Sequence, residues 1–443
     1  MNDLLKEIIL DFQNESLDTG TKRHLKYEFV KDKAFVCIGV RRCGKSTLLY
    51  QIIESLKRNG IENENILYIN FFDDRLTDIK QGSLSLITEA YYSIYPEKKG
   101  TEKIYCFFDE IQEAEDWEPF IDRILRTEKS DVFVSGSSAK MLSKELATQM
   151  RGRSIAWELF PFSFKEFADY KNADYEKLTT KNRLILKNCF DEYFEKGGFP
   201  EVRNISQKIR VMIHQEYYKA ILHRDVIERF NAIHPQAVIQ AAYRLMNSVG
   251  SLYSINRITS YLKSMGFKIS KGFVSSCLEW FEDAYIFFSV KIFSQSPSIQ
   301  NANSKKIYCI DHSLISSVTP GLSSNVGHLL ENIIFLHIRR TTPDLYYYRT
   351  TRGKEIDFVW MDSRRNKNLL QVCSTLNDPL TAKREITSLL QAMDELDLKA
   401  ATIVSLQEEK EIEKDDKQIR IMPAWKFLIM DNKYGRVNRW TSR

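Results

Sequence analysis

A glycine-rich stretch near the N-terminus has the residue types and the spacing that bind phosphate groups. Residues 39–46 read GVRRCGKS, which matches the pattern GxxxxGK[ST]. Glycines at the two ends of such a loop let backbone amides turn toward phosphate oxygens, and the N-terminus of the next helix adds partial positive charge. A lysine at this spacing contacts β- and γ-phosphates, and the following hydroxyl binds Mg²⁺. The residues expected to bind the nucleotide are Gly39, Val40, Arg41, Arg42, Cys43, Gly44, Lys45, Ser46 and Thr47.

A pair of acids follows a second apolar run and suits the hydrolysis of that nucleotide. The run 104–108 ends in Asp109 and Glu110. We expect Asp109, with Ser46, to bind Mg²⁺ and Glu110 to act as the general base for the attacking water. Two adjacent acids at the end of a buried strand are costly without a cation. The alternative is a pair of solvated loop acids.

Ser135 is a further candidate, because it follows the short apolar run 132–134. Its hydroxyl is expected to hydrogen-bond either the attacking water or the γ-phosphate. The alternative is that the serines after this run only cap the next helix. No NKxD motif follows, so the sequence favours ATP over GTP.

These residues need a parallel sheet to position them, and the surrounding pattern predicts one. A match to the loop pattern alone arises by chance in roughly one chain in fifty of this length. The apolar run 34–38 predicts a buried strand before the loop, and apolar residues at helical spacing over 48–56, with Gly60 after them, predict a helix behind it. The further predicted strands are 66–71, 104–108, 132–134 and 155–159. We therefore predict the α/β fold of a P-loop NTPase.

Bulk composition is that of a folded multidomain protein. The chain has 443 residues, of which 43% are hydrophobic and 28% are charged, so it has room for about three domains. Its longest apolar runs have strand length, and the first residues do not form a signal peptide, which predicts a cytoplasmic protein without membrane spans. The scattered seven cysteines and seven histidines favour free thiols over a zinc site.

An ordered series of motifs resembles a known family. The stretches are GVRRCGKSTLL, ILYINFFDDRL, FFDEIQ, VSGSSAKMLS, PFSFKEF, GGFPEV and a later His-Arg-Asp, spread over residues 39–225. This succession resembles the AAA-type ATPases of bacteria and archaea that carry a C-terminal nuclease-like domain. The resemblance implies an ASCE-class P-loop core with a helical lid, then a winged helix, then a domain related to PD-(D/E)xK nucleases. We place these domains at 1–230, 231–305 and 306–443.

Two residues of the first domain carry additional hypotheses. Arg153, which follows Gly152, suits an arginine finger that reaches the γ-phosphate of a second copy in a homo-oligomer. The equal alternative is a salt bridge to a local acid. Cys43 lies inside the phosphate loop, where backbone amides and Lys45 would favour a thiolate, so a redox-sensitive switch is a second hypothesis.

The middle region has the order helix, turn, helix and β-ribbon, which is typical of a winged helix. The helices are expected at 255–262 and 273–281 and the ribbon from 286. Lys268, Lys271 and Lys291 are candidates for contacts with DNA phosphates. Acids on the second helix, among them Glu279 and Glu282, argue for a docking module instead.

The C-terminal region contains a candidate metal site that is incomplete for a nuclease. Glu331 on an apolar helix and Asp357 in KEIDFVW are suitable Mg²⁺ ligands, and Gln371 can add a carbonyl oxygen. The nuclease resemblance requires a lysine where this chain has Cys373. We therefore predict a nuclease fold with impaired or absent cleavage. The alternative is a buried acid pair that holds helix to sheet, and Lys383 or Arg384 would substitute for the lysine only if the fold returned them to the site.

Together these features predict a Mg²⁺-dependent ATPase that uses ATP hydrolysis to remodel or regulate DNA or a protein partner. One alternative is an ATP-gated signalling switch whose C-terminal domain only docks. The other is an ATP-dependent DNA endonuclease.

Overall fold

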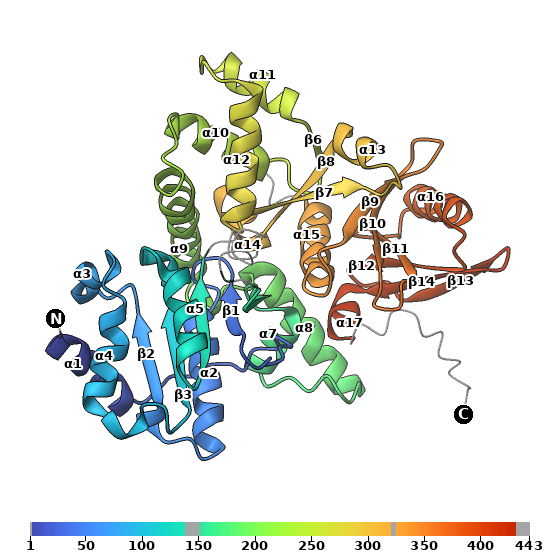
Figure 1. Cartoon of the computed structure of the whole chain (residues 1–443). Coiled ribbons are helices and arrows are strands. Elements are labelled where there is room, and N and C mark those ends of the chain that lie inside the picture. The colour runs from blue at the N-terminus through green and yellow to red at the C-terminus, as the bar shows by residue number, and fades with distance from the viewer. Residues whose placement is uncertain (1, 138–149, 151, 320–324, 431–443) are drawn as a thin grey trace. The chain divides into compact units, whose positions relative to one another are not determined.

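The computed structural model describes residues 2–137, 150, 152–319 and 325–430 (Figure 1). The chain divides into two compact units. The first unit is Met1–Pro161 with Asp283–Tyr285, and the second unit is Phe162–Glu282 with Ile286–Arg443. The division into domains at 1–230, 231–305 and 306–443 stays a prediction.

The first unit is built on a parallel five-stranded sheet, drawn in blue to cyan in Figure 1. Its strands are β1 (Ala34–Ile38), β2 (Ile66–Asn70), β3 (Ile104–Asp109), β4 (Ser130–Gly136) and β5 (Ser154–Glu158). Their order across the sheet is β2-β3-β4-β1-β5, and all neighbours are parallel. β4 thus lies between the strand that leads into the phosphate loop and the strand that ends in Asp109. The predicted α/β fold of a P-loop NTPase is confirmed.

Helices connect these strands, and α2 (Lys45–Arg58) is the helix that apolar periodicity predicts behind the phosphate loop. They are α1 (Asn2–Asn14), α2 (Lys45–Arg58), α3 (Thr77–Lys80), α4 (Ser85–Ile94) and α5 (Trp117–Thr127), with 3₁₀ turns η1 (Asn63–Asn65), η2 (Asp74–Leu76), η3 (Pro96–Lys98) and η4 (Ile111–Glu113). Helix α2 buries one face through Leu48, Leu49 and Ile52. It ends at Arg58, and Gly60, just after the helix, has a φ of 87°, a left-handed conformation that glycine adopts without steric cost.

The second unit is built on a mixed nine-stranded sheet. Its strands are β6 (Leu252–Tyr253), β7 (Phe287–Ile292), β8 (Lys305–Cys309), β9 (Leu345–Arg349), β10 (Glu355–Met361), β11 (Lys367–Val372), β12 (Ala400–Ser405), β13 (Lys410–Lys414) and β14 (Lys417–Pro423). The order is β13-β14-β12-β11-β10-β9-β7-β8-β6. β7 pairs with both β8 and β9, so one sheet continues across the predicted boundary at 305/306.

The helices of the second unit include those predicted for the winged helix. They are α7 (Phe164–Tyr170), α8 (Thr180–Lys196), α9 (Gln207–Ala220), α10 (Pro235–Met246), α11 (Ile255–Ser264), α12 (Lys271–Asp283), α13 (Pro297–Ala302), α14 (His312–Val318), α15 (Val326–Arg339), α16 (Pro379–Leu396) and α17 (Ala424–Ile429). A 3₁₀ turn, η6 (Pro200–Val202), precedes α9, and a π-helical stretch, η7 (Ile221–Glu228), follows it. The winged-helix assignment itself stays a prediction.

The GGFPEV motif joins α8 to the start of α14 within the second unit. The amide of Gly198 donates to Asp311 Oδ2 at 2.7 Å. A Cβ on Gly197 would lie 2.2 Å from Ser313 Oγ, and its φ is 79°. This close approach explains why a glycine pair stands here.

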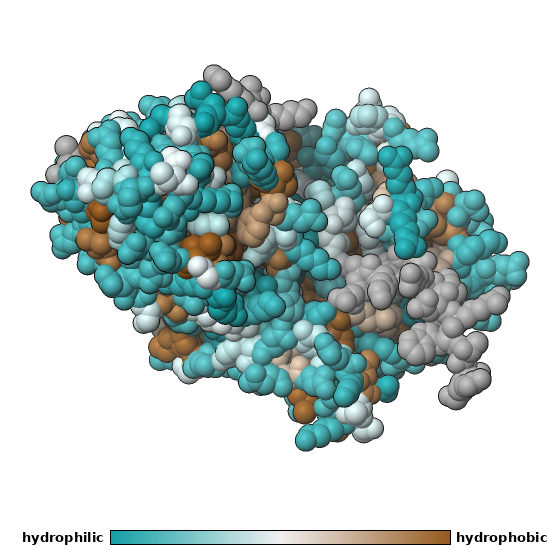
Figure 2. Space-filling model, turned by 60° about the horizontal axis from the view of Figure 1, so that its bottom comes forward, coloured by the Kyte–Doolittle hydropathy of each residue, from teal (hydrophilic) through white to brown (hydrophobic). Residues whose placement is uncertain are grey.

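The surface in Figure 2 is mostly hydrophilic, with hydrophobic side chains scattered over it. Large apolar side chains that are exposed include Leu184, Met212, Ile233 and Leu380. Within the described part of the chain, no helix has the length and the apolar character that crossing a bilayer requires.

Candidate active site

The predicted phosphate loop connects β1 to α2 and has the backbone that such a loop needs. A Cβ on Gly39 would lie 2.1 Å from the Leu159 carbonyl oxygen and 3.0 Å from Cys43 Sγ, so only glycine fits there. Gly44 has a φ of 99°, and Arg42 has a φ of 67°. Left-handed residues in a loop at a helix N-terminus turn amides toward one side, which is the arrangement that holds anions.

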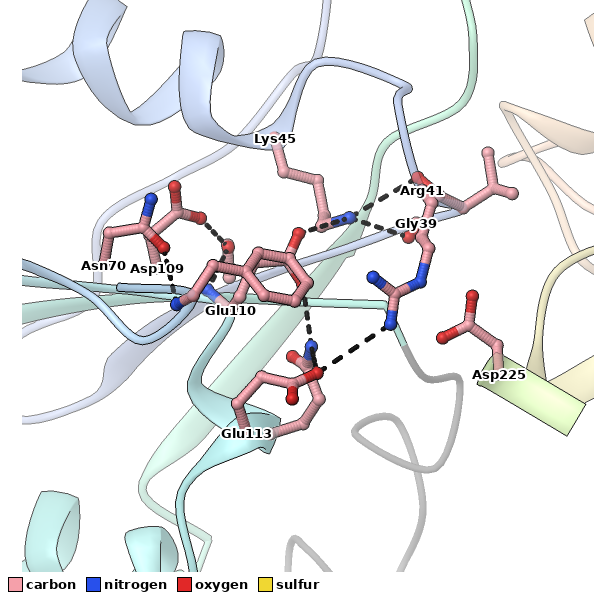
Figure 3. A network of polar contacts seen from close by, with 12 residues as sticks. Gly39, Arg41, Lys45, Asn70, Asp109, Glu110, Glu113 and Asp225 are labelled. Atoms are coloured by element: carbon pink, nitrogen blue, oxygen red, sulfur yellow. Dashed lines mark hydrogen bonds and ion pairs between the residues drawn. The ribbon is translucent and has the colours of Figure 1, made fainter. Parts of the chain in front are cut away.

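Lys45 lies at the centre of the site and is buried. Its ammonium contacts the carbonyl oxygens of Gly39 at 3.2 Å and Val40 at 3.4 Å, and Glu110 Oε1 at 3.2 Å (Figure 3). Burial lowers the pKa of Lys45, but the negative charges of Glu110 and Asp109 and the hydrogen bond to Glu110 act together against burial, and the pKa of Lys45 is raised. The lysine is therefore held as a cation next to the loop.

Asp109, at the end of β3, is fully buried and hydrogen-bonded through both carboxylate oxygens. Tyr68 donates its hydroxyl to Oδ2 at 2.8 Å, and Ser135 donates its hydroxyl to Oδ1. A hydrogen bond with the Ser46 side chain lowers the pKa of Asp109, yet burial and the charge of Glu110 outweigh the hydrogen bonds and raise it. The two predicted Mg²⁺ ligands, Ser46 and Asp109, are thus in contact. A hydroxyl beside a carboxylate is an oxygen donor set that fits Mg²⁺.

Glu110 has a strained backbone, with φ 52° and ψ 45° in the left-handed region. Such a conformation costs about 1–3 kcal/mol for a non-glycine residue, and the hydrogen bond from its amide to Ser135 Oγ at 3.0 Å helps to hold it. Gln112 Nε2 donates to Glu110 Oε2 at 2.7 Å. Burial raises the pKa of Glu110, but Lys45 and Gln112 outweigh burial, so the pKa is lowered. The carboxylate is therefore ionised, as a general base requires.

Ser135 links the two acids, because its hydroxyl donates to Asp109 and accepts from the Glu110 amide. The predicted contact of Ser135 with water or phosphate stays a prediction.

Arg23 is part of the site although no sequence motif indicated it. Its buried guanidinium donates to the carbonyl oxygens of Cys43 and Phe160, each at 2.6 Å. Its amide donates to Gln51 Oε1 at 3.1 Å, which attaches the segment before β1 to helix α2. Arg23 thus holds the phosphate loop from a position 20 residues earlier in the chain.

The expectation that Cys43 is a thiolate is wrong. The side chain is fully buried, and burial raises its pKa despite the nearby charges of Lys45 and Arg23. The loop therefore contains a neutral thiol.

Arg153 forms the local salt bridge that was the alternative to an arginine finger. Its Nη1 lies 3.2 Å from Asp122 Oδ1, and Arg126 Nε lies 3.0 Å from Asp122 Oδ2. The finger role of Arg153 stays a prediction.

The second unit brings together the three candidate residues of the C-terminal region. Glu331 lies on α15, Asp357 on β10 and Gln371 on β11. The Asp357 amide donates to Gln371 Oε1 at 3.2 Å, and the Val372 amide donates to Asp357 Oδ2 at 2.9 Å. Cys373 is not among these contacts, since its Sγ donates to the Thr375 carbonyl oxygen.

Lys306 supplies an ammonium group to this cluster, which the sequence pattern did not predict. Its Nζ lies 2.9 Å from Glu331 Oε1, 2.7 Å from Asp357 Oδ1 and 2.9 Å from Glu355 Oε1. Tyr308 donates to Glu331 Oε1 at 2.6 Å. Burial and the charge of Asp357 raise the pKa of Glu331 to about 7. In the ranges that the structure describes, no three His, Cys, Asp or Glu side chains are grouped as a metal site.

Comparison with protein families identifies three successive regions. Residues 31–168 match an AAA domain. Residues 187–325 and 326–427 match two domains of unknown function, DUF8612 and DUF4143. The nuclease-like character of the C-terminal region is not part of these matches.

Solved structures with a similar fold include a Walker-type ATPase of Pyrococcus abyssi, which is 14% identical, has a TM-score of 0.41, and is matched over 71% of this chain and 94% of that one. The Orc1 protein of Aeropyrum pernix in complex with DNA is 11% identical, with a TM-score of 0.32 and coverage of 73% and 93%.

Two relatives have a much higher sequence identity to this chain. An uncharacterized protein of Haemophilus influenzae is 31% identical over 333 residues, which cover 74% of this chain and 80% of that protein. An uncharacterized protein of Methanocaldococcus jannaschii is 34% identical over 443 residues, which cover 96% of this chain and 95% of that protein. The chain therefore belongs to the family of the M. jannaschii protein, and its AAA domain is that of a P-loop ATPase.

Proposed function

We propose that this protein binds ATP with Mg²⁺ at the loop Gly39–Thr47 and hydrolyses it to ADP and phosphate. One observation carries the proposal: Lys45 and Glu110 lie 3.2 Å apart, beside an Asp109 that contacts Ser46. A phosphate-binding cation, metal ligands and a general base thus converge from α2 and the end of β3. The energy of hydrolysis would remodel or regulate DNA or a protein partner.

Each side chain has a defined task in this reaction. Lys45 donates to the β- and γ-phosphates, and this contact replaces its contact with Glu110 Oε1. The released carboxylate takes a proton from the attacking water, whose oxygen bonds to the γ-phosphorus as the bond to the β-phosphate oxygen breaks. Ser46 and Asp109 are the residues that would hold Mg²⁺, which supplies charge neutralisation for the phosphates.

Turnover and binding in two variants test the assignment. Lys45→Ala and Glu110→Gln should each reduce ATP turnover by about 100-fold or more, because a phosphate contact or the base is lost. Only Glu110→Gln should keep tight ATP binding, measured by isothermal titration calorimetry. Wild-type turnover in both variants would show that the site is elsewhere.

The output of the ATP cycle is testable in the same assay. Stimulation of turnover by single-stranded, duplex or branched DNA would favour remodelling or regulation of DNA. Insensitivity to DNA together with nucleotide-dependent oligomerisation would favour the signalling switch. A finger role predicts that Arg153→Ala loses turnover. Asp122→Asn, which removes the salt bridges of Asp122 with Arg153 and Arg126 but keeps the Arg153 guanidinium, should retain turnover.

We further propose that the C-terminal region has a nuclease-like fold without efficient cleavage. Lys306 neutralises Glu331 and Asp357 from a position between them, so these acids form an internal ion network. Purified protein should leave plasmid DNA intact with Mg²⁺ or Mn²⁺. Metal-dependent cleavage that disappears in Asp357→Ala would overturn this proposal.

A further inference from the structure

The carboxylate of Asp109 is oriented by donors from two neighbouring strands. Tyr68 on β2 donates to Oδ2 at 2.8 Å, and Ser135 on β4 donates to Oδ1. One donor on each oxygen fixes the plane of the carboxylate, while an ionised carboxylate keeps further lone pairs for other partners. The orientation of the Asp109 carboxylate next to Ser46 therefore depends on two residues outside the phosphate loop, Tyr68 and Ser135.

The strand register places Tyr68 on the correct face of the sheet for this contact. Asn70 on β2 is paired with Asp109 on β3, and Tyr68 is paired with Phe107. Residues directly opposite each other point to the same face, and a step of two residues keeps that face. Tyr68 is thus the diagonal neighbour of Asp109 on the adjacent strand. A tyrosine side chain is long enough to reach a diagonal neighbour with its hydroxyl.

The Tyr68 side chain is itself held firmly. It is 5% exposed, and its ring stacks on Phe12 with the centroids 4.0 Å apart and an interplanar angle of 11°. Its hydroxyl also lies 3.3 Å from the Tyr50 hydroxyl on α2. The ring packing positions the hydroxyl, and a phenylalanine at this position would keep the packing and remove only the hydroxyl.

We propose that Tyr68 is a positioning residue for Mg²⁺ binding, because it orients the carboxylate of Asp109. This inference rests on the proposed function of the site as a Mg²⁺-dependent ATPase. Residues that hydrogen-bond a metal ligand typically change metal affinity by about 10–100-fold when they are replaced. Because Ser135 still holds the other oxygen, we expect the lower end of that range.

The test is a Mg²⁺ titration of ATP turnover in Tyr68→Phe at saturating ATP. The half-saturating Mg²⁺ concentration should rise by about 10-fold, and high Mg²⁺ should restore nearly the wild-type turnover rate. ATP affinity measured in EDTA should equal that of the wild type, which also shows that the variant is folded. Tyr50→Phe is the matched control, because it removes a tyrosine hydroxyl of the same network that does not contact Asp109, and it should change the Mg²⁺ requirement by less than about twofold.

Asp109→Asn separates a failure of this inference from a failure of the proposed function. If Asp109→Asn raises the Mg²⁺ requirement and Tyr68→Phe does not, Tyr68 has no positioning role while the proposed function stands. A lower melting temperature of Tyr68→Phe with an unchanged Mg²⁺ requirement would likewise overturn the inference, since it indicates a structural role alone. If the wild-type protein has no Mg²⁺-dependent turnover, the proposed function fails.

Discussion

Replacing Lys306 by methionine tests whether the acidic cluster of the second unit depends on its internal cation. Methionine keeps the apolar stem in place and removes only the charge, so the acids lose their ammonium partner. The substitution removes two buried contacts of Lys306 Nζ, at 2.9 Å to Glu331 Oε1 and at 2.7 Å to Asp357 Oδ1. Removing one partner of a buried ion pair typically costs about 3–5 kcal/mol. Glu355 adds little to this figure because it is one-third exposed.

Hydrogen exchange measures this loss in the whole protein without assuming that the two units unfold together. We expect amides of α15 and β10 in Lys306→Met to lose about 3 kcal/mol of protection, which corresponds to exchange faster by about 150-fold. Lys305→Met is the matched control, because successive residues of a strand point to opposite faces. It should leave exchange in the same peptides within about threefold of the wild type.

If Lys306→Met exchanges like the wild type in the peptides that cover Glu331 and Asp357, the ammonium does not stabilise the cluster. A second variant, Lys306→Met with Asp357→Asn, removes one of the acids left without a partner. It should therefore recover part of the lost protection through a coupling of about 1–3 kcal/mol.

Two further predictions concern the loop and the titration of the cluster. Gly39→Ala should abolish measurable ATP binding in calorimetry, because the new Cβ would lie 2.1 Å from the Leu159 carbonyl oxygen. Gly60→Ala should keep ATP binding, because among the described residues no atom beyond its chain neighbours lies within 4 Å of the new Cβ, and it should lose only about 1 kcal/mol of stability from its left-handed backbone. The folded-state pKa of Glu331 is about 7, above its ordinary value of 4.5, so the folded state holds an extra proton between these values and loses stability as the pH rises. Relative to Glu331→Gln, hydrogen exchange of α15 in the wild type should accelerate across that window by up to about tenfold per pH unit, and an identical pH response in both proteins would contradict this assignment.

The features that the sequence predicted well depend on local patterns. The apolar run of β1, the glycine loop and the periodic face of α2 are adjacent in the chain, so their order identifies them. Asp109 and Glu110 could be predicted at the end of β3 because parallel strands deliver their final residues to one edge of the sheet. The contact of Asp109 with Ser46 follows from the same geometry.

The features that the sequence did not predict depend on distant contacts. Lys306 and Asp357 are 51 positions apart, and nothing in the strand pattern around residue 306 distinguishes its side chain from that of a solvated lysine. The sequence pattern led us to look for a lysine beside Glu331 and Asp357 only at Cys373 and later positions. The ammonium group comes instead from Lys306 on β8, earlier in the chain. The prediction that Cys43 is a thiolate was wrong because it considered the neighbouring charges and left out burial, which raises the pKa of the thiol.

The charged stretch 408–417 contains the edge strand of the nine-stranded sheet. Its residues Lys410–Lys414 form β13, which pairs with β14. Four of the five side chains of β13 are charged and exposed, and charged side chains keep a free strand edge from pairing with another chain.

The contacts of Arg23 bear on how far the nucleotide-binding domain extends along the chain. The part that matches AAA domains begins at residue 31. However, the guanidinium that supports Cys43 and Phe160 comes from residue 23, and Phe12 on α1 stacks on Tyr68. A fragment that starts at residue 31 would leave the carbonyl groups of Cys43 and Phe160 without this donor, and it would lack the Phe12 ring that packs on Tyr68. A minimal ATP-binding fragment of this protein therefore has to include α1.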